Sequence, residues 1–223
     1  MNDARSVVMM GATGAVGGHA ARRLLEMPGV ERLTLLGRRP AAGLEGAKLA
    51  QHVVDVSDPG SYRAHLAGHT TAVCTLGVGE PSKVTREHFV AIDKTAVLAF
   101  ASACRESGVE HFELLSSVGV SSGSRSFYLR TKGELEDGLE ALGFDRLSLF
   151  HPSMILTPTN RYGASQAVAL AIWPLLRPVL LGGLRRFRGV PVETLGRAIA
   201  ENVVTRGAGT EVLEWDRFMA LCA

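Results

Sequence analysis

Short runs of apolar residues recur along the first 150 positions and alternate with longer segments whose apolar residues have helical spacing. Runs without polar alternation are typical of strands that are buried on both faces of a sheet. We expect six such strands, over Ser6–Met10, Arg32–Leu36, Gln51–Val54, Thr71–Leu76, His111–Leu115 and Asp145–Phe150. The intervening pattern predicts helices over Val16–Glu26, Asp58–Leu66, Thr85–Ser107 and Phe127–Leu142. This alternation predicts an α/β protein with a doubly wound parallel sheet, the Rossmann fold.

The segment between the first strand and the first helix is rich in glycine. It reads Gly11-Ala12-Thr13-Gly14-Ala15-Val16-Gly17. Glycines three residues apart allow a tight turn, a close approach of the backbone to a pyrophosphate, and close packing of the helix on its strand. The free N–H groups at the helix N-terminus then face the phosphates. The position of Gly11, Gly14 and Gly17 between a buried strand and a helix therefore predicts a dinucleotide site.

Two arginines follow the second predicted strand, in the segment Leu36-Gly37-Arg38-Arg39-Pro40. In a dinucleotide-binding fold an acid at this point bonds the ribose 2′-hydroxyl of NAD, whereas arginine accommodates the 2′-phosphate of NADP. No acid occurs before Glu45, and two guanidinium groups can fork onto phosphate oxygens. The pair therefore favours NADPH, and a solvated pair in a surface turn is the alternative. Asp55, after the third strand, is expected either to face the adenine or to cap the end of the strand.

Tyr128 and Lys132 are four residues apart in a predicted helix and therefore share one face. Free tyrosine has a pKa of about 10, and lowering it by two units requires roughly 2.7 kcal/mol. A lysine ammonium about 4 Å away offers about 4 kcal/mol at an effective dielectric of 20, so we expect Tyr128 to exchange protons near neutrality. Ser116 and Ser117 end the fifth strand, at the sheet edge where ligands bind. Either hydroxyl can orient a carbonyl oxygen, with a slight preference for Ser117, or the pair only caps the strand.

These motifs together resemble the short-chain dehydrogenase/reductase superfamily. One atypical branch, the Tat-interacting oxidoreductase-like proteins, is similar in the segments Leu36–Arg39, Cys74–Gly77, Leu114–Ser117, Tyr128–Glu134 and Phe144–Arg146. The resemblance covers Val7 to about Val204 and implies NADPH held by Thr13, Gly14, Ala15, Val16, Arg38, Arg39, Leu76, Gly77, Tyr128 and Lys132. It also implies that Ile155 and Arg161 lie near the nicotinamide and the diphosphate. His151-Pro152 stands where the branch has Arg-Pro, so the role of His151 is open.

Composition and charge exclude several classes of protein. The chain has 24 basic and 22 acidic residues, so no strong field indicates a nucleic-acid partner. Its three cysteines are scattered and odd in number, which favours a reducing compartment, and we expect a cytoplasmic protein. No cysteine pair or HExxH spacing indicates a metal site. The first apolar run is too short for a signal peptide.

A chain of 223 residues has room for one large α/β domain. We therefore expect a single dinucleotide-binding domain over residues 1–223, with residues 151–223 supplying the substrate side. Residues 167–184 are almost entirely apolar, but Pro174, Arg177 and Pro178 interrupt them, whereas a membrane span needs about 20 apolar residues. We interpret this segment as a helical lid or a contact between subunits of a homo-oligomer, with peripheral membrane contact as the alternative. A helix over Val192–Val204 is expected to pack back on the sheet.

The leading hypothesis is an NADPH-dependent reductase of a small carbonyl compound. In it, Tyr128 donates the proton, Lys132 lowers the pKa of Tyr128 and holds the nicotinamide ribose, and Ser117 or Ser116 orients the carbonyl group. The alternative is a sensor or scaffold that binds NADPH and a protein partner without turnover. A sensor has no need of tyrosine, lysine and serine together, so the combination favours the enzyme.

Overall fold

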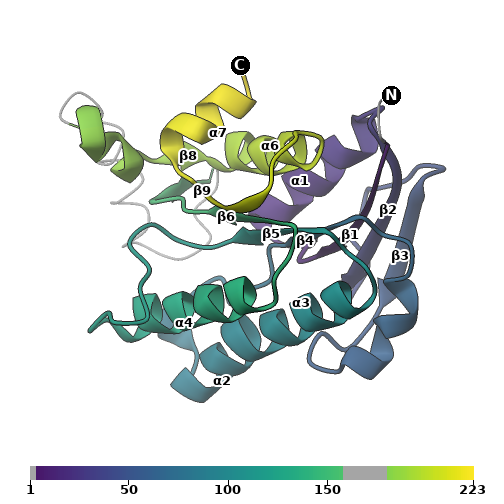
Figure 1. The fold of residues 1–223 in the computed structure, drawn as a ribbon, viewed down its shortest axis with the longest axis horizontal. Helices are drawn as coiled ribbons and strands as arrows, with labels where there is room; N and C mark the ends of the chain where they lie inside the picture. The colour runs from purple at the N-terminus through teal and green to yellow at the C-terminus, as the bar shows by residue number, and fades with distance from the viewer. Residues whose placement is uncertain (1–3, 158–179) are drawn as a thin grey trace.

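In the computed structural model, which describes residues 4–157 and 180–223, a parallel seven-stranded sheet lies between two layers of helices (Figure 1). The strand order is β3-β2-β1-β4-β5-β6-β9, and every neighbouring pair is parallel. The strands span β1 Arg5–Met10, β2 Val30–Gly37, β3 Leu49–Val53, β4 Thr71–Cys74, β5 His111–Leu115, β6 Arg146–Phe150 and β9 Gly209–Leu213. The order reverses direction between β1 and β4, which places a ligand crevice at the carboxyl ends of these two strands. The predicted fold class is confirmed.

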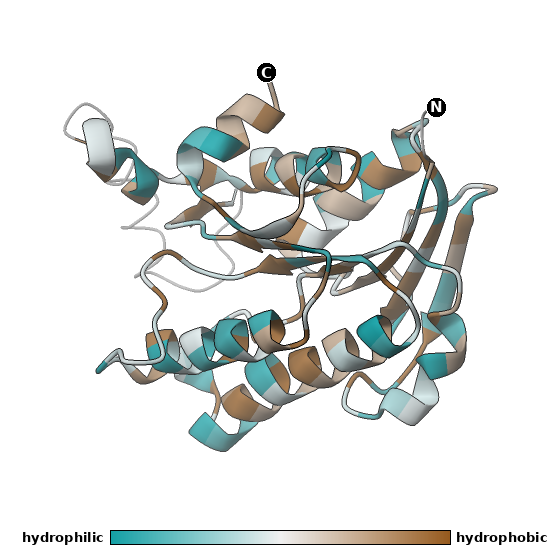
Figure 2. Cartoon of the chain, viewed as in Figure 1, coloured by the Kyte–Doolittle hydropathy of each residue, from teal (hydrophilic) through white to brown (hydrophobic). Residues whose placement is uncertain are grey.

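Each face of the sheet carries its own hydrophobic core. Helices α1 (Ala15–Glu26), α6 (Val192–Val203) and α7 (Trp215–Leu221) cover one face, and α2 (Arg86–Val90), α3 (Val97–Glu106) and α4 (Phe127–Ala141) cover the other (Figure 1). Successive residues of β1 alternate between the two cores: Val7 and Met9 pack under α1 and α6, and Val8 and Met10 pack against α3. The hydrophobic strands lie in the interior, and hydrophilic residues gather on the outer turns of the helices (Figure 2).

Two predicted helices differ from the observed ones. The segment expected as a helix over Asp58–Leu66 forms only two 3₁₀ turns, Pro59–Ser61 and Arg63–His65, and Gly60 within it disfavours a longer helix. The helix expected over Thr85–Ser107 contains a π-helical segment, Ala91–Ala96, between α2 and α3. Such segments are rare and often lie at functional sites.

The C-terminal part contains elements that the sequence did not predict. Strand β9 extends the sheet beyond β6, and α7 covers it. A short pair, β7 (Ile155–Leu156) and β8 (Val190–Pro191), lies beside the main sheet. The expected helix at Val192 is present and packs on α1. Most of the apolar segment, residues 167–179, lies outside the described residues. Among the helices in 4–157 and 180–223, none is long and apolar enough to cross a bilayer.

Candidate dinucleotide and active site

Two adjoining recesses form one elongated cleft at the carboxyl ends of the strands. The first, of about 440 Å³, extends from the glycine turn to the end of β2, and the second, of about 370 Å³, extends from the same turn to α4 and β7. Both are lined by Gly14, Thr75, Leu76 and Gly77. The cleft therefore spans the β1–β4 switch point, as a bound dinucleotide would.

The glycine turn brings backbone to the floor of this cleft. Gly11 has a φ of +99°, a conformation that L side chains rarely adopt, and a methyl group on Gly17 would lie 2.2 Å from the Gly11 carbonyl oxygen. Gly14 is the N-cap of α1 and has no side chain to accept from the first N–H groups of the helix. These N–H groups are thus available to an anion. The turn fits the pyrophosphate of a dinucleotide.

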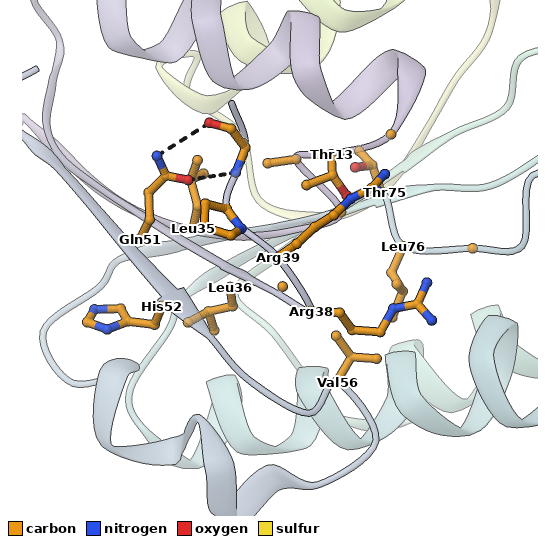
Figure 3. Close-up of a pocket in the computed structure, with 17 residues that line it drawn as sticks. Thr13, Leu35, Leu36, Arg38, Arg39, Gln51, His52, Val56, Thr75 and Leu76 are labelled. Carbon is orange, nitrogen blue, oxygen red and sulfur yellow. Dashed lines mark hydrogen bonds between the residues drawn. The ribbon is translucent and has the colours of Figure 1, made fainter. Parts of the chain in front are cut away.

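Arg38 and Arg39 line the first recess, together with residues of β2 and β3 (Figure 3). In this view the Arg39 side chain extends toward Thr13, and the Arg38 side chain runs beside Leu76. Gln51 on β3 fixes the loop that carries both arginines. The Gln51 Oε1 atom accepts from the Ala41 N–H at 2.8 Å, and Nε2 donates to the carbonyl oxygens of Ala41 and Leu44.

The first recess has no acidic residue among the described residues that line it. Asp55 is exposed and lies outside this lining, and its Oδ1 accepts from the Ser57 N–H at 2.9 Å. This contact matches the expected alternative for Asp55, a cap at the end of the strand. His52 and Val56 line the recess on this side instead.

Tyr128 and Lys132 line the second recess from α4, on the face that their spacing predicts. The Lys132 ammonium lies 3.1 Å from the Asp93 carboxylate, which the π-helical segment carries. Asp93 also accepts from the Val78 N–H at 2.7 Å, and its Oδ1 lies close to Gly77. The Lys132 ammonium is therefore not an isolated charge, because the Asp93 carboxylate offsets part of the field that it exerts on its neighbours.

Of the two candidate serines, Ser116 lines the second recess and Ser117 does not, so the slight preference for Ser117 has no support in the geometry. Ser116 Oγ donates to Glu136 Oε1, and the same oxygen is bonded to His151 Nε2 at 2.9 Å. All three residues are buried. Because Glu136 lies between the other two, His151 does not contact the serine as the base of a hydrolytic triad does. The serine proton is instead directed toward Glu136.

The structure adds Asp93, Glu136, His151 and Gln51 to the residues around the cleft. The helical spacing held one signal, because Tyr128, Lys132 and Glu136 follow one another at intervals of four. No sequence pattern indicated Asp93, because the direction of its side chain depends on the π-helical segment. Of the residues that the resemblance adds, Ala15, Val16 and Ile155 line the second recess, and Arg161 lies outside the described residues.

A family model described as NAD(P)H-binding matches residues 11–162. The protein HTATIP2 of Rattus norvegicus is 34% identical over 213 residues, which cover 94% of this chain and 86% of the rat protein. The mitochondrial protein fmp52 of Emericella nidulans is 30% identical over 169 residues, covering 74% and 72% of the two chains.

Among solved structures, MoeE5 in complex with UDP-glucose and NAD is similar, with a TM-score of 0.70 and 20% identity over 93% of this chain and 75% of that one. The UDP-glucose 4-epimerase of Thermotoga maritima gives a TM-score of 0.71 at 15% identity, over 97% and 81% of the two chains. Identities this low show the fold alone.

Proposed function

The chain belongs to the NAD(P)H-binding family, and from this premise we propose that it is an NADPH-dependent reductase of a small carbonyl compound. The observation that carries the proposal is the composition of the cleft. One end combines a glycine turn with two arginines, and the other end combines a tyrosine with a buried lysine. Bound NADPH would supply a hydride to the carbonyl carbon.

Preference for the phosphorylated cofactor follows from charge at the adenosine end. Arg38 and Arg39 have no hydrogen-bond or ion-pair partner within the described part of the chain, so both guanidinium groups are available to a phosphate. A 2′-phosphate carries close to two negative charges at neutral pH, and the described residues that line this recess include no carboxylate to repel it. NADH lacks this phosphate and would leave both arginines without a partner.

At the other end of the cleft, Tyr128 is positioned to give its phenolic proton to the carbonyl oxygen. Lys132 would hold the nicotinamide ribose while Asp93 keeps its ammonium in place. Ser116 directs its own proton to Glu136, so it presents only oxygen lone pairs to the recess. Tyr128 is thereby left as the proton donor to the carbonyl oxygen. Residues 153–155 line the same recess as Tyr128, which supports the proposal that the C-terminal part contributes to the substrate side.

A non-catalytic NADPH sensor is the second candidate function. It is favoured by one observation: the Lys132 ammonium lies 3.1 Å from the Asp93 carboxylate, which offsets part of the charge that would act on Tyr128. Such a protein would bind NADPH as tightly as the reductase does and would gain nothing from Tyr128.

Two measurements on the purified protein test the proposal. Titration followed by protein fluorescence should give an NADPH affinity at least tenfold above that for NADH, a difference of about 1.4 kcal/mol, and the double variant Arg38→Gln/Arg39→Gln should lose it. NADPH oxidation is then followed with a panel of aldehydes, ketones and quinones. Equal affinities for the two cofactors would contradict the cofactor assignment. Tight NADPH binding without turnover of any compound would favour the sensor.

A further inference from the structure

A third recess, of about 380 Å³, adjoins the adenosine end of the cleft. It shares the Ala12–Gly14 turn and the Arg39–Ala41 segment with the first recess. Its remaining wall contains Gly18 and Arg22 of α1. Arg39 therefore lies at the boundary between the two recesses, and an anion bound to it is open to contact from both sides.

The helix directs Arg22 toward this boundary. Gly18 and Arg22 are four residues apart and lie on the same face of α1. Because Gly18 has no side chain, the space between the Arg22 stem and the glycine turn is left open. Arg22 is exposed, and its long side chain can reorient over the recess at little cost.

Arg22 differs from the neighbouring Arg23 in having a guanidinium group without a carboxylate partner among the described residues. Arg23 lies 2.7 Å from Glu201 and 3.5 Å from Glu26. Arg22, in contrast, has no hydrogen-bond or ion-pair partner in residues 4–157 and 180–223. No Asp or Glu is among the described residues that line either the first or the third recess. Arg38 thus lines the first recess, Arg22 lines the third, and Arg39 lines both, so three guanidinium groups border two adjoining recesses whose described lining contains no carboxylate.

We propose that Arg22 is a further specificity-determining residue for the cofactor, which contacts the 2′-phosphate of NADPH from the side opposite Arg38. Arg39 would lie between the two and touch the phosphate from the loop. The inference rests on the proposed function, because it requires that the phosphorylated cofactor is the one bound. Arg22 extends the phosphate site from the loop after β2 to the first helix.

The experiment compares Arg22→Gln with the wild-type protein by titration with NADPH, NADH, 2′,5′-ADP and 5′-ADP. Glutamine keeps the length and polarity of the side chain but removes its charge. We expect the Kd for NADPH and for 2′,5′-ADP to rise by about five- to tenfold, and the Kd for NADH and 5′-ADP to change by less than about twofold. Arg22→Lys should recover part of the loss, because a charge is restored without the fork geometry.

Arg217→Gln is the matched control, since it removes one exposed positive charge from α7, remote from the cleft. It should change each Kd by less than about twofold at physiological salt. Equal weakening of NADPH and NADH by Arg22→Gln, or no weakening, would overturn the inference. Failure of the proposed function is distinguishable, because it would appear in the wild-type protein as equal affinities for NADPH and NADH. If only the substitutions of Arg38 and Arg39 weaken NADPH binding, the proposed function stands and only the role assigned to Arg22 is overturned.

Discussion

Lys132 Nζ lies 3.1 Å from Asp93 Oδ1, and the two side chains are only 5% and 4% exposed. The same carboxylate accepts from the Val78 N–H. One buried aspartate therefore connects α4, the π-helical segment and the loop after β4. Breaking a buried ion pair on one side leaves an uncompensated charge, which is more costly than removing the pair as a whole.

We expect Asp93→Asn to lower the free energy of unfolding by about 2–4 kcal/mol, because the lysine charge would stay buried without its partner. Asparagine still accepts from the Val78 N–H, so the loss reports on the ion pair. Lys132→Met on its own should be destabilising as well, and the double variant should be less destabilised than the sum of the two, by at least about 1 kcal/mol. Urea denaturation of the four proteins measures this coupling. Additive effects would show that the pair contributes no stability.

Tyr128→Phe should reduce turnover by about 10²–10⁴-fold once a substrate is found, the usual contribution of a positioned acid or base. The ring would still pack against Phe89, whose centroid lies 5.5 Å away, so the fold should be retained. Cofactor affinity should fall by no more than one hydrogen bond, about 0.5–1.5 kcal/mol. Steady-state kinetics and NADPH titration separate the two effects. A variant that turns over like the wild-type protein would leave Tyr128 as a cofactor contact only.

The two serines should behave differently. Ser116→Ala removes the donor to Glu136, and we expect a loss of about 1–2 kcal/mol in unfolding free energy together with lower turnover. Ser117 lies outside the lining of the recess. Ser117→Ala should therefore leave turnover within about twofold, and the free energy of unfolding within about 0.5 kcal/mol, of the wild-type values. Thermal denaturation gives the first quantity without a substrate. A larger effect at Ser117 would return the orienting role to that residue.

Gln51 should affect cofactor binding without touching the phosphate. Gln51→Ala removes the hydrogen bonds that fix Ala41 and Leu44, so the loop that carries Arg38 and Arg39 would become more mobile. We expect the Kd for NADPH to rise by about three- to tenfold, or roughly 0.7–1.4 kcal/mol. Val53→Ala, on the same strand but 65% exposed, is the control and should have no effect. If both variants bind NADPH like the wild-type protein, the loop does not need this support.

The buried carboxyl group of Glu113 should make the free energy of unfolding depend on pH. It is fully buried between β5 and α6, and burial raises its pKa from 4.5 to about 8. The native state therefore keeps its proton where the unfolded chain has lost it. The resulting stabilisation is fully present below pH 4.5 and decreases as pH rises toward 8, at about 1.4 kcal/mol per unit.

Glu113→Gln should remove this dependence, because its amide imitates the protonated acid and still accepts from Asn202. Between pH 6.5 and 8 the wild-type protein should lose about 1–2 kcal/mol more unfolding free energy than the variant does. Burial lowers the pKa of the nearby His111 to about 3, and its contribution to the pH dependence is the same in both proteins, so it cancels in the difference. Denaturation at a series of pH values measures the difference, with exposed Glu110→Gln as the control. Parallel curves for the wild-type protein and Glu113→Gln would contradict the assignment.

Local patterns were sufficient to predict the elements that form the dinucleotide end of the cleft. The apolar run before Gly11, the glycine spacing and the position of Arg38 each depend on neighbours within a few residues. The face shared by Tyr128 and Lys132 follows from helix geometry alone. For this reason the glycine turn, the arginines and the tyrosine–lysine pair line the cleft as expected.

Contacts between distant segments could not be predicted in this way. Strand β9 has a polar, exposed pattern with glycine at its start, and only its pairing with β6 makes it a strand. His151 reaches Glu136 because β6 and α4 are neighbours in space, and the residue types alone do not specify that contact. The role of Ser116 also changed for this reason, because the acceptor of its proton comes from another element.

The π-helical segment has a consequence for insertions and deletions. A turn closed by i→i+5 bonds contains one residue more than an α-helical turn, so the segment behaves as a single inserted residue. Deleting one residue from Ala91–Ala96 would therefore favour a regular helix in which α2 and α3 keep about the same relative rotation. Phe89 and Phe100, which flank the segment and are both buried, could stay in place, whereas Asp93 would lose the widened turn that directs it toward Lys132. The charge partner of Lys132 therefore depends on the number of residues in this helix as much as on the identity of Asp93.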